Sequence, residues 1–253
     1  MAALSQDSAA AEGAPGAGTK VEPLVPDRPD FTDGVLIVER GRPQVEAGFT
    51  FTRIGPARET SLGEALVRVA LSERAELRVG VPSYLRVRDG VEGASGFDNS
   101  FLGTKILLSP GDDGRIGVAL LAGATLSTGS RRVAERGGLQ PEIKLALAKE
   151  FSERVGLGVN LGYARERDGG QRFNDLFASA SLGISLAEGL GGFFEIFARS
   201  KVNAAGDGVR YVAAGLSYLV NPDLMLDVRV GRGLGNDFGS PDYFGGAGAS
   251  LRF

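Results

Sequence analysis

The sequence has 253 residues, a formal net charge of −3, and no His, Cys or Trp. A chain without imidazole or thiol groups lacks the common general bases, nucleophiles and soft metal ligands, so we expect no metal, no cofactor and no enzymatic activity. The small net charge gives no reason to expect a nucleic-acid partner. No run of 18 apolar residues predicts a membrane-spanning helix.

The first 42 residues differ in composition from the rest of the chain. Residues 1–22 are rich in Ala and Gly and are predicted to be disordered. Residues 23–42 contain three of the four prolines from Pro23 to Pro43, which exclude a long regular element, so an extended segment is expected there. The start shows no basic region followed by an apolar one, so the pattern of a signal peptide is not visible. The predicted domains are therefore residues 1–42 and 43–253.

From Gln44 onward, runs of about ten residues alternate between apolar and polar side chains, which indicates β-strands. In "QVEAGFTFTR", for example, Val45, Ala47, Phe49 and Phe51 fall on one face. Continuing in this way predicts 12 strands that start near residues 44, 61, 75, 99, 115, 140, 154, 174, 191, 209, 223 and 242.

The connections between these strands alternate in length. Short turns such as "SERA", "PGDDG", "SER", "AEG" and "NPD" follow every second strand. The other connections are longer or more polar: "RDGVEGASGFDN", "TGSRRVAERGG", "ERDGGQR", "KVNAAGDG" and "GLGNDFGSPD". An even number of strands with this alternation predicts an antiparallel meander with both chain termini at the short-turn end.

One face of the predicted strands carries essentially no charge at mid-strand, whereas the other carries Gly, Ser, Thr, Asn and charges of both signs. Strands of about ten residues can cross a bilayer at a tilt of about 45°. A charge at the bilayer midplane costs roughly 2–4 kcal/mol for Arg or Lys, so the uncharged face is expected to contact lipid. The predicted fold class is all-β: a transmembrane up-and-down antiparallel β-barrel of 12 strands with an extended N-terminal segment.

Twelve charged residues fall on the face that is predicted to point into the barrel. They either line a selective pore or pair across strands and close the lumen, and six acids against six bases favour pairing. These residues are Glu46, Glu64, Arg68, Glu76, Arg78, Lys105, Glu142, Lys144, Glu195, Arg199, Asp227 and Arg229.

Two further groups are expected in the lumen. Five aromatic residues on the inward face form either a path for apolar solutes or simple filling; they are Phe101, Phe177, Phe193, Phe197 and Tyr211. The stretch "PDRPDFTDG" is either a plug that inserts into the lumen through Asp27, Arg28 and Asp30 or a periplasmic tail. A barrel of 12 strands lies between filled 8-stranded and open 16-stranded barrels, so a narrow pore is compatible with either alternative.

The stretch "DRPDFTDG…RGRPQVEAGFTFTR", from Asp27 to Arg53, and the runs "LSERAELRVGV" and "FLGTKILLSP" resemble the outer-membrane transporter family of the meta pathway of phenol degradation. The last strand, with Tyr243, Leu251 and Phe253, resembles the assembly signal of outer-membrane barrels. Together these resemblances cover residues 27–253. They imply a location in the outer membrane of a Gram-negative bacterium, contact with lipid and with the barrel assembly machinery, and uptake of small compounds.

The sequence thus predicts a monomeric, non-enzymatic channel for diffusion of small solutes, aromatic or apolar ones among them. A sealed barrel that presents its long loops to a partner is the alternative. A soluble β protein, which the missing signal peptide would suit, is a third possibility. The identity of the solute does not follow from the residues.

Overall fold

The computed structural model of the protein describes residues 22–111, 114–206, 208–235 and 240–253. None of these residues belongs to a helix that is long and apolar enough to cross a membrane. The strands are β1 (Gln44–Ile54), β2 (Ala57–Leu62), β3 (Ala65–Ser72), β4 (Ala75–Val81), β5 (Tyr84–Asp89), β6 (Glu92–Phe97), β7 (Ser100–Ser109), β8 (Gly117–Leu126), β9 (Gln140–Ser152), β10 (Val155–Asp168), β11 (Gln171–Ala187), β12 (Leu190–Arg199), β13 (Val209–Asn221), β14 (Leu224–Gly233) and β15 (Tyr243–Arg252).

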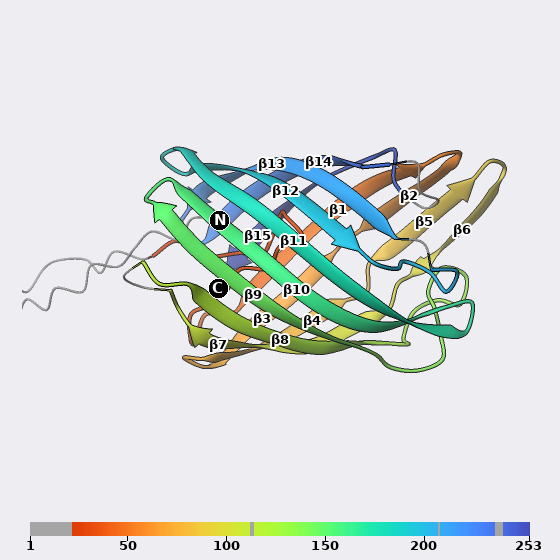
Figure 1. Ribbon diagram of the computed structural model, residues 1–253, viewed down its shortest axis with the longest axis horizontal. Helices are drawn as coiled ribbons and strands as arrows, with labels where there is room; N and C mark the ends of the chain where they lie inside the picture. Colours follow the sequence, from red (N-terminus) through yellow and green to blue (C-terminus); the bar gives the residue numbers. More distant parts are fainter. Residues whose placement is uncertain (1–21, 112–113, 207, 236–239) are drawn as a thin grey trace, which may run out of the picture.

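The strands form one closed antiparallel barrel (Figure 1). The last strand pairs with the first along its whole length, from Gln44↔Arg252 to Arg53↔Tyr243. We call each strand position around the ring a wall. Three walls are each formed by two consecutive strands that a short interruption separates: β2 and β3, β4 and β5, and β6 and β7. The fifteen strands of the described residues therefore build the 12 walls that the alternating pattern predicts, and closure leaves these strands without a free sheet edge around the ring.

The first interruption is a local irregularity opposite β1. Gly63, with φ of +75°, and Glu64 both donate their backbone N–H to the carbonyl of Gly48. Two residues thus face one residue of β1, as in a β-bulge, which bends the wall. As a result, β1 pairs with β3 at one end and with β2 at the other.

Two of the predicted long loops are instead the tips of extended hairpins. The stretch 88–99 contains the end of β5, a turn at Gly90 and Val91, and β6, and the hairpin of β5 and β6 projects beyond the ring of strands (Figure 1). The loop prediction for 166–172 is also wrong, because β10 and β11 pair as far as Asp168↔Gln171. Two-residue turns at Gly90-Val91 and Gly169-Gly170 explain both cases, since their glycines adopt the positive φ that such hairpin turns require.

The burial pattern is the reverse of that of a soluble protein. The largest fully buried side chains include Arg68, Lys105 and Glu46, whereas Leu176 and Val230 are 64% and 65% exposed. A continuous apolar exterior around a polar interior is the pattern of a barrel embedded in lipid. The structure therefore confirms which face of the strands points outward.

Residues 22–42, which we call the inner segment, lie inside the ring of strands. The segment begins beside the turn between β13 and β14, where Leu24 donates to the carbonyl of Pro222. It ends at a turn closed by Arg42 and Glu39, directly before β1. The C-terminus lies at this same end, because Phe253 donates its backbone N–H to the carbonyl of Pro43, directly before β1. We call this end of the barrel the terminal end and the opposite end the far end. Residues 1–21, most of the predicted disordered region, lie outside the described residues.

An apolar contact fixes the inner segment against β8 and β9. Val35 packs with Ala119, Leu121 and Ala146, all of them buried. These three inward positions carry apolar side chains, unlike most inward positions of the barrel. The wall is therefore apolar where the apolar part of the inner segment meets it.

Candidate functional site: the lumen and its inner segment

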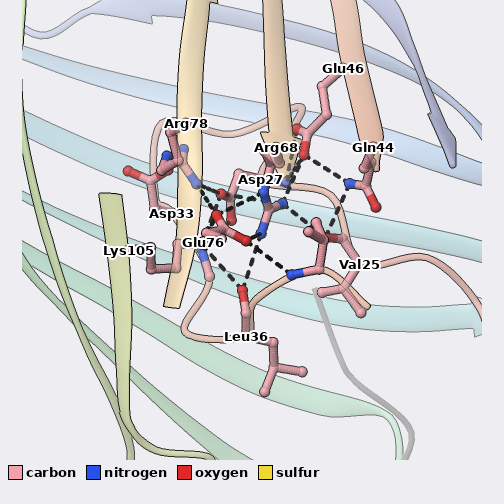
Figure 2. A network of polar contacts seen from close by, with 12 residues as sticks. Val25, Asp27, Asp33, Leu36, Gln44, Glu46, Arg68, Glu76, Arg78 and Lys105 are labelled. Atoms are coloured by element: carbon pink, nitrogen blue, oxygen red, sulfur yellow. Dashed lines mark hydrogen bonds and ion pairs between the residues drawn. The ribbon is translucent and has the colours of Figure 1, made fainter. Parts of the chain in front are cut away.

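A buried cluster of charges joins Asp27 of the inner segment to β3, β4 and β7 (Figure 2). The Asp27 carboxylate accepts hydrogen bonds from Arg78 Nη1 at 2.5 Å and from Lys105 Nζ at 2.8 Å. Arg68 Nη1 forms an ion pair with the same carboxylate at 3.3 Å. One carboxylate of the segment is thus held by cations from three different strands.

Two carboxylates of the wall bind both these cations and the main chain of the segment. Arg68 donates to Glu46 at 2.8 Å and to both oxygens of Glu76 at 3.0 and 3.1 Å. Glu46 also accepts the backbone N–H groups of Asp27 and Arg28 at 3.0 Å, and Glu76 accepts that of Val38 at 2.9 Å. The segment has no strand partner, so these side chains satisfy backbone donors that would otherwise be buried without an acceptor.

Arg28, the next residue, contacts carboxylates instead of cations. Its guanidinium donates to Asp227 at 3.2 and 3.3 Å and to Glu64 at 3.4 Å. Two glycines make room for it, because a Cβ at Gly48 or Gly248 would lie 2.4 or 2.5 Å from guanidinium atoms. Consecutive residues of the segment therefore neutralise opposite local charges on the wall.

Phe31 places an aromatic ring among aromatic residues of the wall. Its centroid lies 5.2 Å from that of Phe197 and 5.8 Å from that of Phe244, and Phe197 stacks in turn on Tyr211 at 5.7 Å. The guanidinium of Arg229 lies 4.7 Å from the Phe31 centroid, within cation–π range. Aromatic pairs contribute roughly 0.5–1.5 kcal/mol beyond their buried area, so this ring anchors the segment.

The turn of the inner segment contacts β10, β11 and β12. Thr32 donates to Glu195 at 2.5 Å, and its hydroxyl lies 2.8 Å from that of Ser179. The backbone N–H of Asp33 donates to Asn160 Oδ1 at 2.8 Å, and Asn160 Nδ2 donates back to the Asp33 carbonyl at 3.0 Å.

The Asp33 side chain faces a second pair of cations. It accepts a hydrogen bond from Arg78 Nη2 at 2.9 Å and a short one from Lys144. Lys144 also lies 5.6 Å from the ring centroid of Phe177. Asp33 therefore links β4 and β9 across the inside of the barrel.

At the far end, charges pair between neighbouring strands instead. Arg199 on β12 donates to Asp175 on β11 at 2.7 Å and to Glu166 on β10 at 2.5 Å. A cavity of about 730 Å³ adjoins this group and is lined by Phe177, Arg199 and Val209, among others.

At the terminal end, Asp223 joins Arg42, the last residue of the inner segment, to Arg252 of β15. Arg42 Nη2 and Arg252 Nη2 lie 2.9 and 2.8 Å from its Oδ1 atom, and Arg252 also donates to the carbonyl of Glu22 at 2.5 Å. The hydrogen bond from Arg42, followed by that from Arg252, lowers the pKa of the Asp223 carboxyl from its ordinary value.

All twelve charged residues expected in the lumen are buried or half-buried. Ten of them contact the inner segment directly; the other two are Glu142, which lines a cavity beside Lys144, and Arg199. Of the aromatic residues, Phe197 contacts the segment, and Tyr211 stacks on Phe197. Whether these residues select solutes stays a prediction.

The remaining predicted residues lie as follows. Asp30 is half-buried, near enough to Glu195 for the two charges to repel. The outward-facing Tyr243, Leu251 and Phe253 are 48%, 38% and 63% exposed, so their role in assembly is a separate prediction.

Sequence reasoning missed several residues of the site. Phe31, Thr32 and Asp33 are in the quoted stretch "PDRPDFTDG", but no periodicity marks which of its residues face the wall. Asn160 and Phe244 stand on the inward parity of their strands, so the alternating pattern could have identified them.

Comparison with known proteins agrees with this geometry. Residues 26–253 match the family described as "Putative MetA-pathway of phenol degradation". Among solved structures, the NanC porin superposes with a TM-score of 0.56 at 15% identity over 83% of this chain and 100% of its own. The KdgM porin superposes with a TM-score of 0.50 at 12% identity over 83% of this chain and 99% of its own. No curated protein sequence matches significantly. The barrel therefore has the fold of a porin.

Proposed function

We propose, from the premise that the chain belongs to this MetA-pathway phenol-degradation family, that it is an outer-membrane channel through which small solutes diffuse. The observation that carries the proposal is an apolar exterior around a polar lumen in which a non-strand segment is held by side chains. Aromatic and apolar solutes are the favoured class, because the family description refers to phenol degradation and aromatic rings line the lumen.

In this proposal the inner segment is a plug, and the structure represents the closed channel. The segment contacts walls from β1 to β14, so a solute cannot pass at its level unless it moves. Its contacts are mostly charged hydrogen bonds, and the balance between desolvation and attraction makes such buried pairs weak contributors to net stability. A plug held in this way is well suited to leave the lumen and return.

The further parts of the proposal concern location and assembly. The barrel would lie in the outer membrane of a Gram-negative bacterium as a monomer, because one chain supplies every wall. It would have no enzymatic activity, because the chain lacks His and Cys. Its last strand, with Tyr243, Leu251 and Phe253 facing outward, would serve as the recognition element for the barrel assembly machinery.

A disulfide lock tests the role of the plug. Thr32 and Ser179 have hydroxyls 2.8 Å apart, and the native chain contains no cysteine, so the double variant Thr32→Cys/Ser179→Cys can form one intramolecular disulfide. In proteoliposomes, we expect swelling in small solutes to stop when the variant is oxidised and to return on reduction. Each single-cysteine variant is the matched control and should respond to neither treatment. Swelling that is above the protein-free background and equal in both redox states would contradict the plug.

The projecting hairpin of β5 and β6 supports a second candidate function. Val91 at its tip is fully exposed, and the hairpin extends beyond the ring of strands. A sealed barrel that presents this hairpin to a partner would show no swelling in either redox state. That outcome would favour the second candidate over the channel.

A further inference from the structure

A cavity of about 240 Å³ lies beside the Asp33 side chain. Both cations that hold Asp33, Arg78 and Lys144, line it, together with Glu142 and the apolar side chains of Phe101 and Leu121. Its volume equals that of about eight water molecules, below the usual range for drug-sized ligands. We propose that this cavity is a binding site for a small aromatic carboxylate, for which Asp33 of the inner segment is the built-in competitor.

The carboxylate would replace the side chain of Asp33. Lys144 donates to Asp33, and Arg78 divides its donors among Asp33, Asp27 and Glu76. When Asp33 withdraws, Lys144 and one side of the Arg78 guanidinium lose this acceptor. Arg and Lys bind carboxylates through charge-assisted hydrogen bonds, so the cavity then offers a carboxylate site.

The ring of the ligand would lie against Phe101. Three glycines surround this side chain: a Cβ at Gly80, Gly103 or Gly123 would lie 2.8, 2.7 or 2.4 Å from Phe101 atoms. The absence of side chains at these positions lets the ring pack closely on the wall. A flat, fixed aromatic surface beside two cations is complementary to a planar ring that carries a carboxylate.

The local charges favour an anion over a neutral ring. Arg78 and Lys144 face Asp33 and Glu142 in the cavity lining, so the four charges balance while the segment is in place. Without Asp33, one positive charge remains, and a monoanion restores neutrality. A neutral phenol or alcohol does not compete with Asp33, because it brings no charge to replace it.

Competition between the ligand and Asp33 couples binding to release of the inner segment. A ligand that binds better when the segment is withdrawn shifts the equilibrium toward that state by its differential affinity. This coupling rests on the proposed function, whereas binding at the cavity does not.

The test is isothermal titration of the full chain in detergent micelles with benzoate at pH 7. Asp33→Asn should bind benzoate about tenfold more tightly than the native chain, because the competing charge is gone. Lys144→Gln should bind it about tenfold more weakly. Asp175→Asn removes a lumen carboxylate that contacts Arg199 instead, so it is the matched control and should leave the affinity unchanged.

Benzyl alcohol serves as the neutral probe of similar size. The site is supported if benzoate binds at least tenfold more tightly than benzyl alcohol and if Asp33→Asn increases that preference. Equal affinities for the two probes, or a benzoate affinity that neither Asp33→Asn nor Lys144→Gln changes, would overturn it. Slower migration of the boiled than the unheated sample on a gel checks that each variant has folded.

Swelling of proteoliposomes separates this inference from the proposed channel. A channel that passes neutral solutes but fails the benzoate titration retains the proposed function and loses the binding site. A barrel that binds benzoate as expected but passes no solute retains the site and loses the channel.

Discussion

The two halves of the lumen are built from the same alternating strands but neutralise their inward charges differently. In the half near the terminal end, Arg68 and Lys105 are fully buried, and both pair with Asp27 of the inner segment. In the half near the far end, Arg199 pairs with carboxylates of the two preceding strands and keeps 24% of its side chain exposed. One half therefore depends on a segment that can leave, whereas the other is complete within the wall.

This difference assigns separate tasks to the two halves. Withdrawal of the inner segment would uncover charges in the terminal half, where Asp27 and Arg28 now neutralise the wall. It would also uncover Lys144 on β9, which now pairs with Asp33. The charges of the far half, such as Arg199, would stay paired whether the inner segment is in place or withdrawn. We therefore expect substitutions in the terminal half to affect stability and closure, and substitutions in the far half to affect selectivity.

The largest expected effect follows from removing the central cation of the terminal half. Arg68→Met leaves Glu46, Glu76 and Asp27 buried with fewer cations, and breaking a buried pair typically costs about 3–5 kcal/mol. Unfolding in urea, followed by circular dichroism in micelles, measures this loss.

Arg199→Met is the matched control for that comparison. The same change of side chain should cost less, because Glu166 is partly exposed to water, and the buried Asp175 keeps hydrogen bonds from Ser200 Oγ and the Lys201 backbone N–H after the arginine is removed. Equal losses of unfolding free energy in the two variants would show that the halves do not differ in this way.

The fold was largely predictable because the alternating pattern directly reflects which side of each wall faces lipid. That pattern predicted 12 walls, the terminal-end turns and the inward charges. It failed at positions 88–99 and 166–172, where polar, glycine-rich hairpins extend beyond the apolar belt and no longer alternate. Outside the belt there is no lipid to impose the pattern, so hairpin and loop look alike in sequence.

The site was predictable only in part, because its two components carry different information. The alternation of inward and outward positions along the strands identified Arg78 and Lys105 as inward residues. Their main partner, however, comes from the inner segment, whose sequence has no such periodicity. Contacts such as that between Lys144 and Asp33 join residues more than a hundred positions apart. Such pairings depend on how the segment turns inside the closed barrel, which local sequence does not encode.

The next effect concerns the aromatic anchor of the inner segment. Phe31→Ala removes the stacking on Phe197 and the contact with Phe244, so we expect the segment to withdraw about tenfold more often. Val35→Cys, at a position that is 5% exposed, reports withdrawal through its rate of reaction with a maleimide. Phe193→Ala is the control, since Phe193 packs near Gly215 of the wall. If both alanine variants raise the labelling rate equally, Phe31 does not hold the inner segment in place more strongly than Phe193 of the wall does.

A smaller effect is expected in the far half. Arg199→Gln leaves the carboxylates of Asp175 and Glu166 without their cation, so the lumen there becomes more attractive to cations. Under a salt gradient across a planar bilayer, the reversal potential should shift toward the equilibrium potential of the cation. The shift should correspond to a few-fold increase in the ratio of cation to anion permeability. Maleimide labelling at Val35→Cys should not change. If labelling changes while the reversal potential does not, the proposed division of tasks is wrong.

The smallest effect is a pH dependence at the terminal end. Hydrogen bonds from Arg42 and Arg252 lower the pKa of Asp223, so its carboxylate stabilises the folded chain at pH above the ordinary Asp value of about 3.9. This contribution disappears as the pH falls through the lowered pKa, because the acid then takes up a proton in the folded state as well. The difference in unfolding free energy between the native chain and Asp223→Asn should therefore be constant from pH 7 to about 5 and shrink below about 4. Asp242→Asn, which alters the 3.9 Å pair with Arg53 at the far end, is the control. A difference for Asp223→Asn that persists unchanged at pH 2 would show that Asp223 does not act through its charge.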